Sequence, residues 1–362
     1  MRIYLDHNAT TPVAPAVRDA VLPLLGERFG NPSSGHREGR DARELLDGAR
    51  RQVAAAFGAR PTEVLFTSSG TEAIHAAIRG VAAGGHVVTS AVEHAATFEA
   101  WPHATRIGVD RRGVWDVAAV VDAVRPDTKL VSLMHANNET GAMLPVAEVG
   151  RALRERGVLL HVDAVQSAGK VPVSLDGLCC DLLSVSGHKL YGLKGAGALI
   201  VRHGVRLTPL IAGHQERGRR GGTENLIGVV GLGAACARVG ELIAAMPRVA
   251  ALRDRLQAGV EALGGIVHGA EVERTANTLS ARFPGVDGES LLLHLDLAGI
   301  AASSGSACTT GDTRPSHVLL AMGLGPAEAH GALRLSLGVG TTEGEVDATL
   351  EALADILPRV RD

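Results

Sequence analysis

A lysine and an aspartate at the ends of two predicted strands have the chemistry of a cofactor site. Lys189 follows an apolar run in SVSGHKLYG, and Asp163 ends the earlier run HVD. A lysine in a partly closed site can form a Schiff base with an aldehyde. An aspartate can keep a pyridine nitrogen protonated, and pyridoxal 5′-phosphate (PLP) needs both. The simpler interpretations are a solvated surface lysine and a turn or N-cap aspartate.

A second set of residues offers hydrogen-bond donors to a phosphate. The segment VLFTSSGTEAIHAAI predicts a strand, a Ser/Gly turn and a helix. Backbone N–H groups at that helix start, with Gly70 and the Thr71 hydroxyl, would form an anion cradle. Ser186 and His188 add donors directly before Lys189. The alternative is a capped turn that binds no ligand.

Other polar residues could contact the cofactor ring or the substrate. His94 in AVEHAAT could stack on a pyridine face, or it could be a structural histidine. Asn138 and Gln166 offer amide groups to the ring hydroxyl and to the reacting carbon region. Arg334 in ALRLSLG could bind a substrate carboxylate in bidentate fashion, unless it is a solvated strand arginine.

Cys308 is the candidate nucleophile among the four cysteines. It lies in AASSGSACTTGDTRPSH, where small and polar residues predict an exposed loop. Reactivity requires access and a thiolate, so a loop cysteine is suited to it, although a passive loop cysteine would look the same. Cys179 and Cys180 stand in an apolar run and are predicted to be small core residues.

The elements that must position these residues alternate between strand and helix. Apolar runs predict strands at 64–68, 86–90, 129–137, 158–165, 181–186 and 197–202. A helical pattern over 41–57 ends at Gly58. This alternation predicts an α/β fold with a mostly parallel sheet, in which ligands bind at the carboxyl ends of the strands.

After about residue 245 the pattern changes to a smaller α+β region. A long helix over 246–263 is followed by short strands near 277–283 and 332–337. We therefore predict a large domain over 15–245 and a small domain formed by 1–14 with 246–362. The sequence leaves open whether the first dozen residues pack on the small domain or across the cleft.

Composition excludes several classes of protein. The chain has 362 residues, 46% hydrophobic and 21% charged, which indicates a globular enzyme-sized protein rather than a disordered one. A net charge of −3 without a basic stripe argues against nucleic-acid binding. The sequence shows no signal peptide, membrane span or metal-ligand spacing, and sparse cysteines fit a reducing compartment, so we expect a cytoplasmic protein without an intrinsic metal.

Taken together, the motifs resemble the NifS/IscS-type cysteine desulfurases, in the class V aminotransferase group of fold-type I PLP enzymes. The resemblance covers nearly the whole chain, and the matching segments occur in the family's order. They are YLDHNATTP, NPSSGHREGR, FTSSGTEA, MHANNETG, HVDAVQSAGK, SGHKLYG, QERGRRGGTEN, SSGSACT and RLSLG. Such long and specific segments are not expected by chance.

The resemblance implies a role for each candidate residue. Lys189 would bind the cofactor aldehyde and act as the base, Asp163 would pair with the pyridine nitrogen, and Cys308 would accept sulfur. His94 would stack on the ring, Asn138 and Gln166 would contact the cofactor, and Arg334 with Asn138 would bind the substrate. The phosphate would be held by Gly70, Thr71, Ser186 and His188, with Thr223 of RGGTEN reaching over from the second subunit of a homodimer.

The resemblance also implies a reaction and partners. L-cysteine would yield L-alanine and a persulfide on Cys308, which an acceptor protein would take for iron–sulfur cluster assembly or another thiolation. Cys308 could transiently bind an iron–sulfur cluster. Only 28 residues follow Arg334, so we expect a shorter C-terminal tail than in housekeeping members. The alternatives are another fold-type I PLP enzyme, such as a selenocysteine lyase or an aminotransferase, and a non-catalytic assembly protein that keeps the fold.

Overall fold

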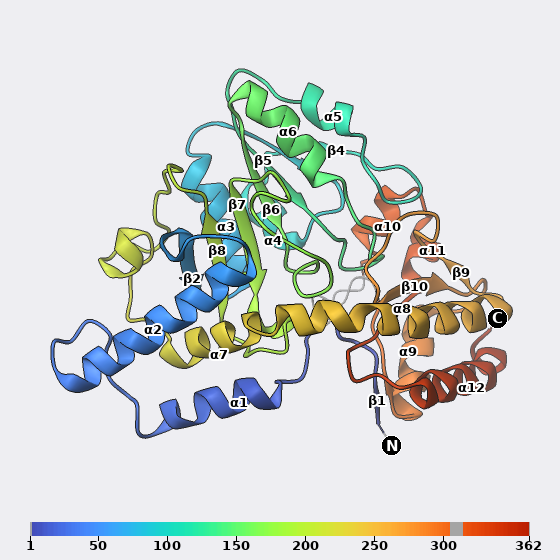
Figure 1. The fold of residues 1–362 in the computed structure, drawn as a ribbon. Coiled ribbons are helices and arrows are strands. Elements are labelled where there is room, and N and C mark those ends of the chain that lie inside the picture. Colours follow the sequence, from blue (N-terminus) through green and yellow to red (C-terminus); the bar gives the residue numbers. More distant parts are fainter. Residues whose placement is uncertain (1, 305–313, 362) are drawn as a thin grey trace.

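The computed structural model describes residues 2–304 and 314–361 and is built around a seven-stranded sheet (Figure 1). The strand order is β2-β8-β7-β6-β5-β3-β4. Strands β7, β6, β5, β3 and β4 run parallel to their neighbours in that series, and β8 runs antiparallel to both β2 and β7. The strands are β2 (Val64–Thr67), β3 (His86–Ser90), β4 (Thr105–Ile107), β5 (Thr128–Met134), β6 (Leu159–Asp163), β7 (Leu182–Ser186) and β8 (Gly197–Val201).

Helices cover both faces of this sheet, which explains why most of its strand residues are buried. Leu130 and Leu182 face one layer, formed with α3 and α4, whereas the next residues, Val131 and Leu183, face the layer formed with α2, α6 and α7. The helices up to this point in the chain are α1 (Pro15–Val21), α2 (Arg37–Ala56), α3 (Gly70–Val81), α4 (Ala95–Ala100), α5 (Val117–Asp122), α6 (Val146–Arg156) and α7 (Leu226–Cys236).

The C-terminal elements enclose a separate apolar cluster. It lies on a three-stranded antiparallel sheet, β12-β10-β9, and on the two-stranded parallel sheet β1-β11. Helix α8 joins the two parts, because Leu242 packs in the first core and Leu256 in the second (Figure 1). The elements are β1 (Ile3–Tyr4), α8 (Val239–Ala262), β9 (Ile266–Val267), β10 (Thr278–Arg282), α9 (Gly288–Leu297), β11 (Ile300–Ala301), α10 (His317–Ala321), α11 (Pro326–His330), β12 (Ala332–Ser336) and α12 (Glu343–Val360).

The predicted α/β fold with a mostly parallel sheet is confirmed, and the differences lie at the ends of elements. The expected strand 129–137 ends at Met134, because the Asn137 side chain accepts the N–H groups of Glu139 and Thr140 and turns the chain. The expected helix at 246 begins at Val239, with Pro247 inside it. Proline favours the first turn of a helix, so it is a misleading start signal here.

The N-terminal segment connects the C-terminal elements to the main sheet. Strand β1 pairs with β11 through Ile3 and Ile300, and the Leu5 N–H donates to the Ala301 carbonyl at 2.8 Å. Farther along, the Thr11 hydroxyl donates to the His188 carbonyl at 2.8 Å, beside β7. The two arrangements that the sequence left open therefore both occur, one in each half of the segment.

No single helix in residues 2–304 and 314–361 is long and apolar enough to span a membrane. Helices α7 and α8 meet the length and composition criterion only as a pair bent by 56°.

Candidate active site

A cleft of about 440 Å³ lies at the carboxyl ends of β5, β6 and β7. Ten of the predicted site residues share this one cleft although they are spread over the sequence. They are Gly70, Thr71, His94, Asn138, Asp163, Gln166, Ser186, His188, Lys189 and Arg334. The parallel arrangement of β5, β6 and β7 brings them together, because parallel strands end at the same edge of a sheet.

Lys189 is held at the cleft by the N-terminal segment. It ends a short 3₁₀ turn, Gly187–Lys189, that follows β7. Its Nζ donates to the Ala9 carbonyl at 2.8 Å and also to the Asn8 carbonyl. Lys189 is partly buried, so it is not the solvated surface lysine of the simpler interpretation. Two carbonyl acceptors fix the amine beside the cleft.

Asp163 is a buried carboxyl at the end of β6. Burial raises its pKa from 3.8 to about 6, while the Val165 N–H bond and the charge of Lys189 act in the opposite direction. Its Oδ1 accepts that N–H at 2.9 Å, so the residue also caps a turn, as the simpler interpretation predicts. A carboxylate in this position is destabilised until a positive group meets it, and a protonated pyridine nitrogen is such a group.

Donors gather around the start of α3. The Ser69 side chain caps the helix by accepting the Glu72 N–H at 3.1 Å. The other N–H groups of the first turn, which faces the cleft, are left for other acceptors. A Cβ at Gly70 would lie 2.9 Å from Val165 Cγ2 and 3.4 Å from Ser186 Cβ, so glycine permits this close approach. The Ser186 Oγ is buried without a hydrogen-bond partner in the structure. An orphaned buried hydroxyl beside a helix start fits a phosphate oxygen.

Two histidines of the cleft are neutral at pH 7. Burial, followed by the charges of Lys189 and Lys194, lowers the pKa of His188 to about 4. Burial and the charge of Lys189 also lower the pKa of His94. The His94 Nδ1 accepts the Ala96 N–H at 3.1 Å at the start of α4, which fixes the imidazole plane at the cleft. A fixed, uncharged imidazole is suited to stacking on an aromatic ring.

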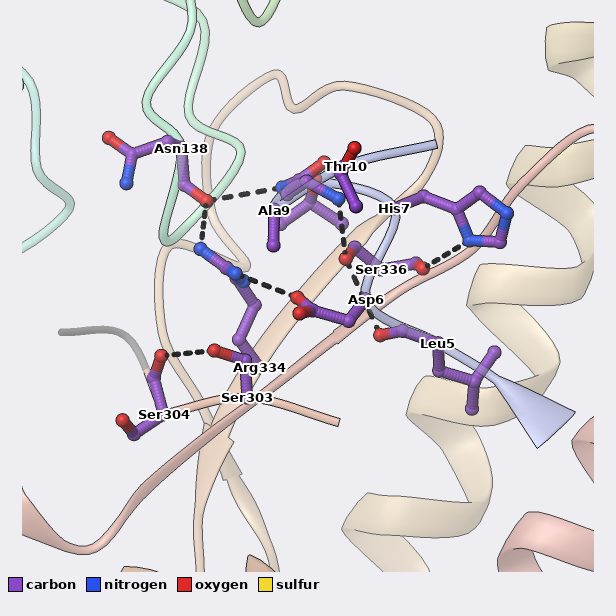
Figure 2. A network of polar contacts seen from close by, with 12 residues as sticks. Leu5, Asp6, His7, Ala9, Thr10, Asn138, Ser303, Ser304, Arg334 and Ser336 are labelled. Carbon is purple, nitrogen blue, oxygen red and sulfur yellow. Dashed lines mark hydrogen bonds and ion pairs between the residues drawn. The ribbon is translucent and has the colours of Figure 1, made fainter. Parts of the chain in front are cut away.

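Arg334 is buried on β12 and ion-paired, so the simpler interpretation as a solvated arginine is wrong. One terminal nitrogen lies 2.8 Å from Asp6 Oδ1 and the other donates to the Asn138 carbonyl at 3.0 Å (Figure 2). Figure 2 shows the guanidinium between these two groups, with the Asn138 side chain pointing away from it. Asp6 therefore orients a guanidinium that lines the cleft.

The sequence of this chain is similar to those of proteins of known class. The aminotransferase class-V family model matches residues 3–349. A cysteine desulfurase of Enterobacter agglomerans is 46% identical and covers 99% of this chain and 93% of its own length. The chain belongs to the aminotransferase class-V family.

Other relatives narrow the position within this family. The cysteine desulfurase IscS of Dictyoglomus turgidum is 42% identical and covers 99% of this chain and 95% of its own length. Among solved structures, a NifS-like protein superposes with a TM-score of 0.93 at 37% identity, over 99% of this chain and all of that one. SspA in complex with cysteine gives 0.83 at 31%, over 94% and 100%. This chain thus groups with the cysteine desulfurases of the class-V family. The predicted cofactor, PLP, is confirmed, because this family depends on PLP.

The cleft fits the PLP that this class-V family uses. Asp163 offers a carboxyl whose pKa burial raises despite the charge of Lys189, Ser186 offers a buried hydroxyl without a hydrogen-bond partner, and Lys189 lines the same cleft. These are the residues that would hold the ring nitrogen, the phosphate and the aldehyde. Through them the group would supply an electron sink for a carbanion.

Two predicted residues are not in the cleft of the described chain. Thr223 is exposed, in a loop that Arg220 ties to α3 through Glu72 at 3.0 Å. Cys308 lies outside the described residues. The chain leading to it passes the cleft, because Ser303 pairs with Arg334 through backbone hydrogen bonds.

Two of the three described cysteines are buried and unsuited to act as a nucleophile. Burial raises the pKa of Cys180 and of Cys236 to about 12, so neither forms a thiolate near neutral pH. Cys180 is a core residue as predicted, whereas Cys179 is only partly buried. Among residues 2–304 and 314–361, no group of three or more His, Cys, Asp and Glu could hold a metal ion.

The structure adds residues that the motif analysis left without a role. Asp6, Asn8 and Ala9 reach the site from the N-terminal segment, and Lys170 contacts Gln166 at 2.8 Å. Their motifs, YLDHNATTP and QSAGK, stood out in the sequence. A folded chain was needed to show that these motifs meet.

Proposed function

We propose that the protein is a cysteine desulfurase that transfers the sulfur of L-cysteine to Cys308 and releases L-alanine. The observation that carries the proposal is the meeting of Lys189, Asp163 and the unused Ser186 hydroxyl in one cleft, with Arg334 in the same lining. The relatives are named cysteine desulfurases, and one solved neighbour is a complex with cysteine.

The chain's own residues divide the work of the reaction. Arg334, oriented by Asp6, binds the carboxylate of the substrate with help from Asn138. Lys189 takes the proton from Cα and returns a proton later, and the Asn8 and Ala9 carbonyls hold its amine. Asp163 would balance the positive charge of the ring nitrogen, and His94 would stack on the ring.

The sulfur step moves one sulfur atom from the substrate to Cys308. The Cys308 thiolate attacks the substrate sulfur, an S–S bond forms, and the bond between Cβ and sulfur breaks. Cysteine and the Cys308 thiol thus give alanine and a Cys308 persulfide. Support comes from the flanks of residues 305–313, because Ser303 pairs with Arg334 and the His317 Nε2–H donates to the Glu93 carbonyl at 2.9 Å, beside His94.

We also propose the wider setting that the family suggests. The persulfide passes to an acceptor protein for iron–sulfur cluster assembly or another thiolation, in the cytoplasm. Thr223 serves the phosphate of a second subunit in a homodimer, which agrees with its exposed position on a loop tied to α3. The division into a domain over 15–245 and one formed by 1–14 with 246–362 stays a prediction.

The test is a product analysis of the PLP-loaded protein with L-cysteine and a thiol reductant. Alanine and sulfide are expected in equal amounts, and Cys308→Ser should abolish both without changing the absorbance of the bound cofactor. Cys179→Ser, at a partly exposed cysteine in the described chain, is the matched control and should retain full turnover.

Other outcomes would favour the alternatives. A keto acid product would indicate an aminotransferase, and selective turnover of selenocysteine would indicate a lyase for that substrate. Absence of PLP absorbance that responds to cysteine would favour a non-catalytic assembly protein. Full sulfide and alanine production by Cys308→Ser would refute the persulfide step.

A further inference from the structure

A second lysine lies behind the cleft, in contact with residues that reach the cofactor site. Lys170 is partly buried and shares a small cavity of about 20 Å³ with Lys189. Its Nζ donates to Gln166 Oε1 at 2.8 Å and to Asn8 Oδ1 at 3.1 Å. A desolvated amine beside Lys189 and Arg334 has its pKa lowered well below the ordinary value. Removing a lysine amine from water costs free energy, so a lysine at this position is expected to have a role other than keeping the protein in solution.

The partners of Lys170 have only one arrangement that satisfies their hydrogen bonds. The Asn8 amide nitrogen faces the Asn138 carbonyl at 3.1 Å, and a carbonyl can only accept, so Asn8 Oδ1 must face Lys170. Likewise Gln166 Nε2 donates to the Asn8 carbonyl at 2.9 Å, and its Oε1 accepts from Lys170. The acceptor of the Gln166 amide is therefore occupied from behind the cleft.

This arrangement decides what Gln166 offers to the cofactor. With Oε1 bound to Lys170 and one N–H bound to Asn8, the second N–H of the amide remains for the cleft that Gln166 lines. Gln166 can then donate this N–H to a ring oxygen. A donor beside that oxygen favours its anionic form.

The same contacts also set the position of Lys189. The Asn8 carbonyl accepts both the Gln166 amide and the Lys189 amine. The Asn8 side chain is further tied to the C-terminal elements by Asn277 at 3.0 Å and Thr278 at 2.9 Å. The segment that holds Lys189 is thereby attached to both cores of the protein.

We propose that Lys170 is a positioning residue of the cofactor site, which fixes Gln166 as a hydrogen-bond donor toward the PLP ring and holds the Asn8 carbonyl against Lys189. The proposal rests on the proposed PLP site and on the contact of Gln166 with the cofactor that the family resemblance implies, but it does not depend on cysteine as the substrate. Lys170 acts through Gln166 and Asn8 and has no contact with reacting atoms.

A double-mutant cycle on the PLP-loaded protein tests this role. The variants are Lys170→Met, Gln166→Leu and the double variant, with Lys129→Met at an exposed site on β5 as the control. The readouts are the PLP dissociation constant, the visible absorbance of the bound cofactor and its pH titration, and the Tm of the cofactor-free protein.

Lys170→Met and Gln166→Leu should each weaken PLP binding about tenfold, the equivalent of one lost hydrogen bond, and shift the absorbance titration in the same direction. The double variant should be within about twofold of Gln166→Leu, because both changes remove one donor. Lys170→Arg, which keeps N–H donors, should restore the spectrum in part. Lys129→Met should match the wild-type protein in every readout.

Two results would overturn the proposal. A Lys170→Met protein with a lower Tm but wild-type absorbance and PLP affinity would show a purely structural lysine. Losses that multiply in the double variant, to about a hundredfold, would show that Lys170 does not act through Gln166. If Lys170→Met does not fold, Lys170→Leu, which also lacks an N–H donor, carries the same expectations. Sulfur release does not enter these readouts, so a failure of the proposed function would appear separately.

Discussion

Replacing Asp163 with asparagine should stabilise the cofactor-free protein at neutral pH while weakening PLP binding. Asp163 is 6% exposed, and its pKa in the folded protein is raised from 3.8 to about 6. A raised pKa means that the folded form holds the proton more tightly than the unfolded form does. Stability is therefore lost as the pH rises from 3.8 through 6, and the full penalty remains above that range.

The expected change in unfolding free energy follows from the size of the pKa shift. A difference of about two pKa units corresponds to about 3 kcal/mol of unfolding free energy at pH 8, and to about half of that at pH 5. Asparagine has nearly the same shape and keeps an oxygen for the Val165 N–H, which Asp163 accepts at 2.9 Å. The variant should thus gain about 3 kcal/mol at pH 8 and much less at pH 4.

Urea unfolding of the cofactor-free proteins at pH 4, 5 and 8 measures this gain. Buried Glu93 and Glu139, with pKa values raised to about 8 and about 7, also titrate near this range, so the difference between variant and wild type is the relevant quantity. Asp116→Asn is the matched control, because Asp116 makes the same kind of bond, to the Ala118 N–H at 3.0 Å, on an exposed surface. Its stability should change by less than about 0.5 kcal/mol.

The reasoning fails if Asp163→Asn is less stable than the wild type at pH 8, or if its gain does not depend on pH. Either result would mean that the carboxylate is already compensated within the protein chain. In the loaded protein the order should reverse, since the variant lacks the charge that meets the ring nitrogen. Equal PLP affinities of the two proteins would contradict the pairing of Asp163 with the ring.

The remaining predictions concern the other groups of the cleft. Lys189→Ala should lose the visible absorbance of bound PLP together with turnover, as followed by absorbance and alanine formation, whereas a retained Schiff-base absorbance would exclude this lysine. Ser186→Ala should weaken PLP binding by about 10- to 100-fold, because a hydrogen bond to a charged phosphate is worth about 1.5–3 kcal/mol. An unchanged dissociation constant would mean that the phosphate lies elsewhere. Asp6→Ala should lower the unfolding free energy by about 3–5 kcal/mol, because it leaves the buried Arg334 without a carboxylate. Urea unfolding measures this loss, with Asp6→Glu as the control that keeps the charge. A loss below about 1 kcal/mol would argue against the prediction.

The main elements could be read from the sequence because their signals are local. Apolar runs with buried residues on both faces predicted the six principal strands, and the helical repeat over 41–57 corresponds to α2. The short β4 was missed, since three residues carry too little pattern. The helix predicted to start at 246 starts at Val239, and Pro247 lies inside it.

The candidate site was also largely readable, because its residues stand in long, specific motifs. Motifs give residue identity and chemistry, so Lys189, Asp163 and Arg334 could be named with their expected roles. They do not give partners. That Arg334 is buried against Asp6, and that Lys189 donates to the carbonyls of Asn8 and Ala9, depends on contacts between segments far apart in the chain.

The sequence by itself determined the fold class, the family and the identity of the chemical groups, because propensity, hydrophobic period and motif spacing are properties of neighbouring residues. Only the tertiary structure decided the burial that raises the pKa of Asp163 and the N-terminal segment that completes the cleft. It also decided the position of Lys170 behind Gln166. Burial and long-range hydrogen bonds arise when separate elements pack together, so they become fixed only in the folded chain.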